Sequence, residues 1–203
     1  MDRTRRLWRY VAMWRPFALV LTLLAAPLSA QQEMTEVDVE LVLAVDVSRS
    51  MSPYELEIQR RGYAAALSSQ EVMDAIGGGM IGRIALTYVE WAGGSSQTVV
   101  VPWTLIDSRE AADEVAATLT TVFSSGMRRT SISEALIHAA DSFEINTYTG
   151  LRRVIDISGD GPNNQGRPVL TARDEVTGRG IIINGLPLMT HDELSSDWGI
   201  PDL

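Results

Sequence analysis

Residues 39–51 read VELVLAVDVSRSM, and this stretch decides the fold. Its apolar run is followed by Asp46, Ser48 and Ser50 at alternating positions. Continuous apolar runs are typical of strands buried on both faces of a parallel sheet, so the stretch predicts a buried strand that ends in a polar loop. The loop offers hard oxygen ligands without sulfur or imidazole, a set that suits Mg²⁺ or Mn²⁺. Asp and Ser are also ordinary turn residues, so the pentapeptide alone is compatible with a solvated loop.

The first 30 residues have the layout of a secretory signal peptide. Arginines dominate residues 3–9, an apolar run covers 17–26, and Leu-Ser-Ala at 28–30 offers a small-residue cleavage site. Because the apolar run is short for a membrane span, we expect cleavage before Gln31, no transmembrane span in the mature chain, and a periplasmic or secreted location in a bacterium. An uncleaved N-terminal anchor is the alternative, and the Arg5-Arg6 pair leaves both general secretion and twin-arginine export open.

Composition predicts one globular domain, at 38–203, after a short polar tether at 31–37. The chain has 203 residues, of which 45% are hydrophobic, enough for a sizeable core. The signal segment carries five Arg and one Asp, so its removal changes the net charge from −9 to −13. A domain this acidic is a poor partner for nucleic acid. The absence of cysteine excludes disulfides, thiolate metal sites and a cysteine nucleophile.

Helix and strand signals alternate along the rest of the chain. Ser52, Pro53 and Glu55 form a capping box that opens a helix extending to about Leu67. We expect its inner face to carry Leu56, Ile58, Tyr63, Ala66 and Leu67. Further helices are predicted at 70–76, 109–121, 132–143 and 168–177, and strands at 39–47, 83–91, 97–103, 154–157 and 181–186, the last of them buried.

This order predicts an α/β fold: a Rossmann-like, doubly wound, mostly parallel sheet with one antiparallel edge strand and helices on both faces. The antiparallel pair would be 83–91 with 97–103, because only a short Gly- and Ser-rich turn joins them. Asp46 and Asp160 each follow a buried strand, and Thr130 directly precedes a helix. Ligands bind such sheets at the carboxyl ends of strands where the strand order reverses, so we expect these three loops to converge there.

Together the three loops resemble the metal-ion-dependent adhesion site (MIDAS) of the von Willebrand factor type A (vWA) domain. The family pattern falls on Asp46, Ser48 and Ser50 in the first loop, Thr130 in the second and Asp160 in the third. Within this fold, residues 37–190 are most similar to an exported bacterial group, domain of unknown function 1194 (DUF1194). The motifs that carry this likeness are VELVLAVDVSRSM at 39–51, QRRGYAAAL at 59–67, YVEWAG at 88–93, VVVPWTLID at 99–107 and RRVIDISGDGPNNQG at 152–166.

The resemblance implies an exported, non-enzymatic module that binds a protein through Mg²⁺ or Mn²⁺. In the family, the hydroxyl groups contact the cation, the Asp residues act directly or through water, and an Asp or Glu of the partner protein takes an open coordination position. The rim around such a site would contain Met51, Tyr54, Met127, Arg128, Arg129, Asn163 and Asn164. The family fold also continues after 181–186 with a strand and a closing helix, so the chain is expected to be truncated or to have a shorter edge.

An envelope hydrolase is the alternative, with Ser48 or Ser50 as nucleophile, His138 as base and Asp160 as its orienting acid. His138 lies in the middle of a predicted helix among apolar residues, where a packing role is the simpler interpretation, and His191 lies near the end of the chain. The acids that a glycosidase would need are explained more simply as a helix-cap partner, Glu55, and a strand residue, Glu90. Trp91 and Trp103 are expected to pack in or beside the core. Asp156 interrupts a buried strand and must find a partner.

Overall fold

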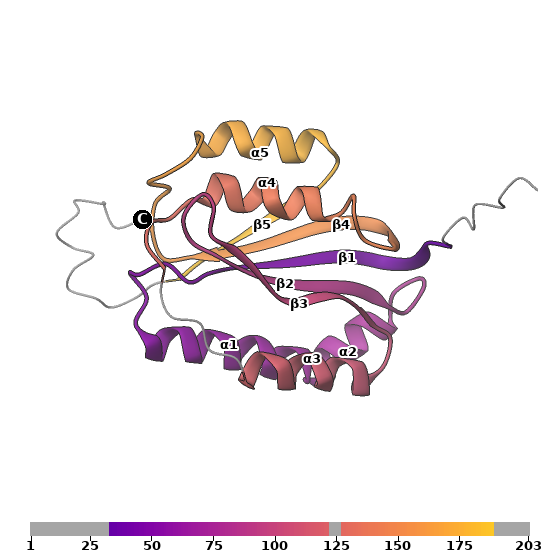
Figure 1. Ribbon diagram of the computed structural model, residues 1–203. Coiled ribbons are helices and arrows are strands. Elements are labelled where there is room, and N and C mark those ends of the chain that lie inside the picture. Colours follow the sequence, from indigo (N-terminus) through magenta and orange to yellow (C-terminus); the bar gives the residue numbers. More distant parts are fainter. Residues whose placement is uncertain (1–32, 122–126, 189–203) are drawn as a thin grey trace, which may run out of the picture. The chain divides into compact units, whose positions relative to one another are not determined.

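The computed structural model describes residues 33–121 and 127–188, which form a five-stranded sheet between two layers of helices (Figure 1). The strand order is β3-β2-β1-β4-β5. The predicted signal peptide at 1–30 lies outside the described residues. So do residues 189–203, and the expectation that the chain lacks the family's final strand and helix therefore concerns a part that the structure does not describe. The strands are β1 (Thr35–Asp46), β2 (Ile84–Trp91), β3 (Gln97–Ile106), β4 (Tyr148–Gly159) and β5 (Ile182–Pro187).

Strand pairing confirms the predicted fold class. The central strand β1 is parallel to both β2 and β4, and β5 extends the sheet parallel to β4. Only the β2–β3 pair is antiparallel, with β3 at the edge. The chain proceeds from β1 to β2 and β3 on one side, then crosses to β4 on the other, so the strand order reverses between β1 and β4. This reversal creates a crevice at the carboxyl ends of the two strands.

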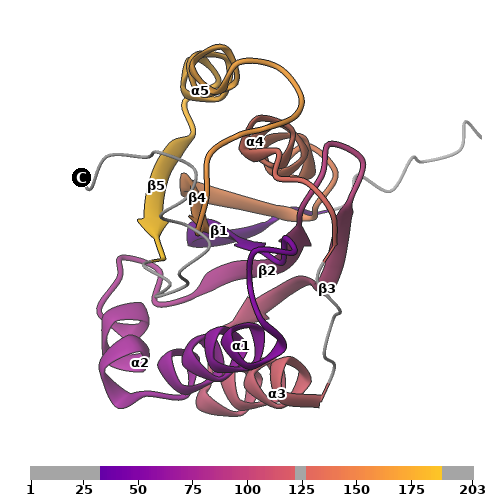
Figure 2. The same ribbon diagram turned by 90° about the vertical axis from the view of Figure 1, so that its left-hand side faces the viewer.

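Helices cover the two faces of the sheet unequally. One face carries α1 (Pro53–Leu67), α2 (Gln70–Gly77) and α3 (Arg109–Thr121), and the other carries α4 (Ile132–Ser142) and α5 (Val169–Gly178) (Figures 1 and 2). Because successive strand residues point to opposite faces, β1 contributes to two cores. Leu43 and Val45 pack in the α1–α3 core, whereas Val42 and Ala44 pack in the α4–α5 core.

Helix α1 has the predicted bounds and capping box, but its inner face was predicted incorrectly in part. The buried residues are Leu56, Arg60, Ala64 and Leu67, whereas Ile58 is 50% exposed. Consecutive helical residues are about 100° apart, so Ile58, two positions after Leu56, points to the opposite side of the helix. Ala66 is exposed, and Arg60 occupies an inner position that was expected to be apolar.

Two strands extend further towards their N-terminal ends than predicted. β1 begins at Thr35, so it includes the last residues of the 31–37 segment, and β4 begins at Tyr148 instead of position 154. Two buried acids of β1, Asp38 and Glu40, interrupt its apolar pattern, and both accept hydrogen bonds from main-chain N–H groups. The carboxylate of Asp38 accepts from the main-chain N–H groups of Ile81 and Gly82, and the Glu40 carboxylate accepts from that of Gly150.

Strand β5 was predicted to be buried, and most of its residues are exposed. Ile182 is 46% and Leu186 54% exposed, although Ile183 packs against the α4–α5 core. Among the described residues, β5 pairs only with β4 and is covered from one face. An apolar sequence does not reveal whether a strand lies at the centre or the edge of a sheet. No helix in the described ranges is both long and apolar enough to cross a membrane.

Candidate metal centre

The first loop brings three predicted site residues to the carboxyl end of β1. Asp46 is the last strand residue, and its Oδ1 atom accepts a hydrogen bond from the Ser48 main-chain N–H at 2.7 Å. The Ser48 and Ser50 hydroxyl oxygens lie 3.0 Å apart. Ser48 is 1% exposed and Ser50 is exposed. The side-chain oxygens of Asp46, Ser48 and Ser50 therefore lie in sequence from the buried end of β1 to the solvent-exposed part of the loop.

Asp160 reaches the same oxygen atoms from the neighbouring strand. The Ser50 hydroxyl donates to Asp160 Oδ1 at 2.8 Å across the gap between the first and third loops. The parallel β1–β4 pairing pairs Val45 with Ser158, so the two acids follow adjacent strand ends. Gly159 permits the close approach, because a Cβ atom there would lie 3.1 Å from Asp46 Oδ2. The structure thus brings four of the five predicted site residues into one hydrogen-bonded group.

Thr130 lies on the second loop, which contacts both of the others. Its main-chain N–H donates to Asn164 Oδ1, and its carbonyl accepts from the Asn164 N–H, each at 2.9 Å. On the other side, Met127 forms a parallel bridge with Ser48. Thr130 is 6% exposed, and its hydroxyl makes no hydrogen bond with any described residue. The predicted convergence of the three loops is therefore present, and Asn164 is a tether that the sequence reasoning missed.

The two acids of this group carry charge that the protein compensates poorly. Asp46 is fully buried, and its Oδ2 atom has no hydrogen-bond partner in the described structure. Burial raises the pKa of Asp46 to about 6, the negative charge of Asp160 adds to the rise, and the Ser48 hydrogen bonds oppose it. Burial also raises the pKa of Asp160, against the lowering effect of the Ser50 hydroxyl. A cation between the two carboxylates would offset both unfavourable effects.

The donor set fits a hard divalent cation. It offers two carboxylates and three hydroxyl groups, and oxygen ligands are those that Mg²⁺ and Mn²⁺ prefer. Among the described residues, no group of three or more His, Cys, Asp or Glu side chains is placed to hold a metal. A metal site built from the described residues would therefore need other oxygen donors besides acids, and the hydroxyl groups of Ser48 and Ser50 are such donors.

A buried polar group beneath the loops ties α1 to the sheet. Arg60 Nε donates to Glu90 Oε1 at 2.6 Å, and both side chains are almost fully buried. The residue before it, Gln59, donates from Nε2 to Ser158 Oγ at 3.1 Å. Glu90 was interpreted only as a strand residue, and Arg60 was not considered. The signal was an acid within the apolar β2 sequence, because a buried charge requires a partner.

The rim is smaller than predicted by one residue, because Met51 lies in the interior. Met51 is only 5% exposed and packs with Val47 and Leu56, so it belongs to an apolar anchor under the first loop. Asn163 Oδ1 accepts from the Ser133 N–H. The predicted rim residues that are exposed or partly exposed are Tyr54, Met127, Arg128, Arg129, Asn163 and Asn164.

The contacts of the two serines differ from those of a Ser–His–Asp triad. Their hydroxyl groups bond to each other and to Asp160, and within the described residues neither bonds to a histidine. His138 lies partly buried on α4, and His191 is outside the described residues.

Two other acids have structural partners. Glu55 completes the α1 capping box as predicted. Asp156, which was expected to need a partner, accepts a 2.7 Å hydrogen bond from Asn184.

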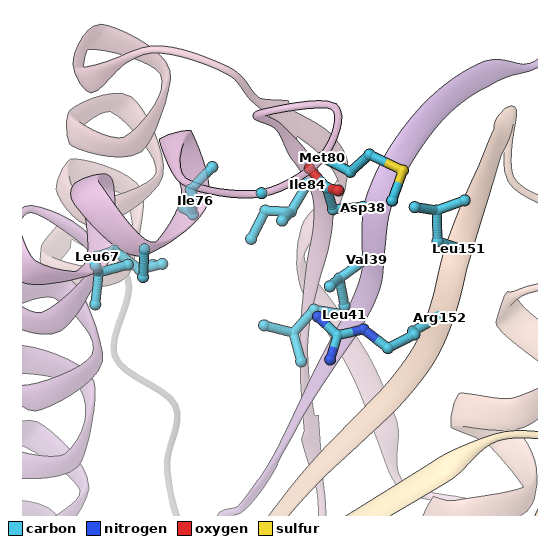
Figure 3. Close-up of a pocket in the computed structure, with 12 residues that line it drawn as sticks. Asp38, Val39, Leu41, Leu67, Ile76, Met80, Ile84, Leu151 and Arg152 are labelled. Carbon is cyan, nitrogen blue, oxygen red and sulfur yellow. The ribbon is translucent and has the colours of Figure 1, made fainter.

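A separate cavity of about 560 Å³ lies at the opposite end of β1 (Figure 3). Apolar side chains from β1 and α2 dominate its wall, with Asp38 and Arg152 at its edge. The Asp38 carboxylate is engaged by main-chain N–H groups of the loop after α2. This cavity shares no residue with the group around Asp46, so it is not part of the candidate metal centre.

Comparison with known proteins supports the family resemblance and the fold. The profile of the family described as "Protein of unknown function (DUF1194)" matches residues 36–202. Among curated proteins, none matches this chain.

Solved structures with a similar backbone come from distant proteins. A structure of proximal thread matrix protein 1 from the mussel byssus is 14% identical to this chain, with a TM-score of 0.57, and the match covers 75% of this chain. A second structure of the same protein, 16% identical to this chain, is described as having a zinc-occupied MIDAS motif. This chain covers 38% of the length of those mussel chains. An aerotolerance-related membrane protein from Bacteroides fragilis is 20% identical, with a TM-score of 0.50 and coverage of 73% and 67% of the two chains. These likenesses identify the fold as vWA-like.

Proposed function

Since the chain belongs to the DUF1194 family and has a vWA-like fold, we propose that it is a metal-dependent protein-binding module. One observation carries the proposal. Hydrogen bonds join Asp46, Ser48, Ser50 and Asp160 across two adjacent strand ends, and Asp46 Oδ2, a buried carboxylate oxygen, has no hydrogen-bond partner among the described residues. The mussel protein described with a zinc-occupied MIDAS motif supports a metal site in a protein of similar fold.

The proposed ligands of the cation are Asp46, Ser48, Ser50, Thr130 and Asp160, and the proposed ion is Mg²⁺ or Mn²⁺. Mg²⁺ favours a full shell of oxygen ligands and gives up water reluctantly. Neutral hydroxyl groups donate less charge to the ion than carboxylates would, so the bound ion would still attract an anionic oxygen. An Asp or Glu side chain of a partner protein supplies that oxygen, which makes the cation the bridge between the two proteins.

We further propose that the module is exported and has no catalytic activity of its own. The arginine-rich start, apolar run and cleavage site support export to the periplasm or beyond. The serine hydroxyls of the site bond to each other and to Asp160, and to no histidine among the described residues, so they do not form the Ser–His–Asp arrangement of a hydrolase there. Mass spectrometry of the exported protein should find an N-terminus near Gln31, and an intact chain in the cytosol would contradict export.

Calorimetric titration with Mg²⁺ tests the metal site. The wild-type protein should bind one ion, and Asp160→Asn should lose that binding, because the substitution removes a charged oxygen from the group. Asp156→Asn is the matched control: it makes the same change four residues earlier on β4, and its side-chain oxygen still accepts from Asn184. Equal Mg²⁺ affinity in the wild type and Asp160→Asn would place the site elsewhere.

Partner capture tests the binding function. Immobilised protein is exposed to an envelope extract in Mg²⁺ and in chelator, alongside Thr130→Ala in Mg²⁺. A partner retained only by the wild type in Mg²⁺ supports recognition through the cation. Equal recovery under all three conditions would show that the metal does not mediate it.

A further inference from the structure

Arginines in the described part of the chain are mostly paired. Arg60, Arg61, Arg153, Arg167, Arg173 and Arg179 form ion pairs with acids, and Arg83 and Arg109 donate to main-chain carbonyl groups. Four others make no ion pair or side-chain hydrogen bond with any described residue: Arg49, Arg128, Arg129 and Arg152.

Three of these four arginines lie at the candidate metal centre. Arg49 stands between Ser48 and Ser50, and Arg128 and Arg129 directly precede Thr130. The parallel bridge of Ser48 with Met127 brings these two loop segments side by side. All three arginines are exposed. Three exposed arginines therefore lie on the two adjacent loop segments that carry Ser48, Ser50 and Thr130.

The backbone at Arg129 adds an independent observation. Its φ angle is 72°, the only positive φ among the described residues other than glycine. A side chain at such an angle is strained, and glycine would adopt it without that cost. Backbone strain of this kind concentrates at functional segments, where the side chain or the loop shape is needed. An arginine held in this conformation beside Thr130 indicates a use for its guanidinium group.

We propose that Arg49, Arg128 and Arg129 form an arginine rim that reads further acids in the partner. The partner segment is then an acidic peptide stretch, with one Asp or Glu for the cation and additional Asp or Glu residues on either side of it. Guanidinium groups suit this role because their planar N–H donors match the two oxygens of a carboxylate. The rim also offsets the repulsion between an acidic partner and an acidic domain. This inference rests on the proposed function.

Peptide binding tests the rim. The probes are three blocked peptides of equal length: one with a single central Asp, one with that Asp flanked by two Glu on each side, and one with the same flanks and a central Asn. The variant is the triple R49Q/R128Q/R129Q. Its control is R61Q/R152Q/R173Q, which removes the same charge from exposed arginines away from the three loops. Calorimetry with Mg²⁺ alone is run on every protein.

We expect the wild type in Mg²⁺ to prefer the flanked acidic peptide over the single-Asp peptide about tenfold, as exposed charge pairs contribute modestly each. The rim variant should lose that preference and retain Mg²⁺ binding, single-Asp binding and thermal stability, while the control variant behaves as the wild type. The preference should also weaken as salt rises. The central-Asn peptide should bind weakly to all three proteins.

Different failures overturn different statements. A rim variant that binds Mg²⁺ and keeps the full preference for the flanked peptide would overturn the rim and leave the proposed function intact. Mg²⁺ binding without binding of either Asp peptide would overturn the partner chemistry. A wild type that does not bind Mg²⁺ would overturn the proposed function itself, and the rim with it. Equal arginine-dependent binding of the sulfated polysaccharide heparin in Mg²⁺ and in chelator would show a general anion patch instead of an acid-reading rim.

Discussion

Replacing Asp46 by Asn should stabilise the metal-free protein at neutral pH. The carboxylate is fully buried, one of its oxygens has no hydrogen-bond partner in the described part of the chain, and its pKa is raised from 3.8 to about 6. At about 1.36 kcal/mol for each pH unit, this difference corresponds to a destabilisation of about 3 kcal/mol when the group is ionised. Asn can still accept from the Ser48 N–H, but its NH₂ group lacks an acceptor, which costs about 1 kcal/mol. The net gain is about 2 kcal/mol.

The pH dependence has a defined sign. Because the folded protein binds the Asp46 proton more tightly than the unfolded chain does, the wild-type free energy of unfolding falls as pH rises from 3.8 through about 6 and then levels off. The Asn variant has no such group. Its advantage over the wild type should therefore be largest above pH 7 and almost absent at about pH 4.5. Asp160, whose pKa is also raised, is common to both proteins.

Thermal unfolding in chelator is the assay. At pH 7.5 the Asn variant should melt about 4–8 °C above the wild type, given about 2–4 °C per kcal/mol for a domain of this size. Mg²⁺ at about 100 times its dissociation constant should stabilise only the wild type, by about 2.7 kcal/mol, and so close the gap. Asp156→Asn controls for the removal of one negative charge from the sheet. A lower melting temperature for Asp46→Asn in chelator at pH 7.5, or a gap that persists at pH 4.5, would refute the reasoning.

Three further predictions concern the framework of the site. Glu90→Gln should lower the free energy of unfolding in urea by about 3 kcal/mol by leaving the Arg60 charge buried, and an apolar replacement of both residues should recover most of it. Ser52→Ala should cost about 1 kcal/mol in the same assay, since it removes the α1 cap; no change would mean that water replaces the hydroxyl. Leu136→Ala should cost about 2–5 kcal/mol through a core cavity, whereas Ile58→Ala should change stability by less than about 0.5 kcal/mol; similar effects would contradict the burial described for α1 and α4.

The predictable parts of the fold are those with local signals. The apolar run before Asp46 predicts a buried strand, and Ser52, Pro53 and Glu55 predict the start of α1 within a residue. The alternation of such elements limits the topology to a mostly parallel sheet, because short connections and right-handed crossovers exclude most alternatives. The approach of Asp160 to Ser50 then follows from the topology, since the loops that carry these residues follow the carboxyl ends of adjacent strands.

The parts that escaped prediction depend on distant partners. Arg60 looks like a solvated helix residue until Glu90, 30 positions later, is placed beneath it. Asn164 is predicted only as a rim residue, and its contact with the Thr130 main chain becomes visible once the two loops are placed together. The exposure of β5 depends on what covers the strand, which its own residues do not specify. In each case the environment of the residue depends on a segment far away in the sequence, and no local pattern indicates which segment that is.

The first loop owes its shape to the protein itself. The turn at Asp46 is closed by the Ser48 N–H, Val47 and Met51 pack into the apolar anchor with Leu56, and Ser52 caps the helix that follows. Both serine hydroxyls are therefore positioned by folding, and the entropy cost of ordering this loop is met before any cation binds. Among the described residues, the hydrogen bond from Ser50 to Asp160 joins the third loop to these hydroxyl oxygens. A cation held by the proposed ligands would attract both Asp46 and Asp160, so part of its binding energy would act between β1 and β4, at the point where the strand order reverses.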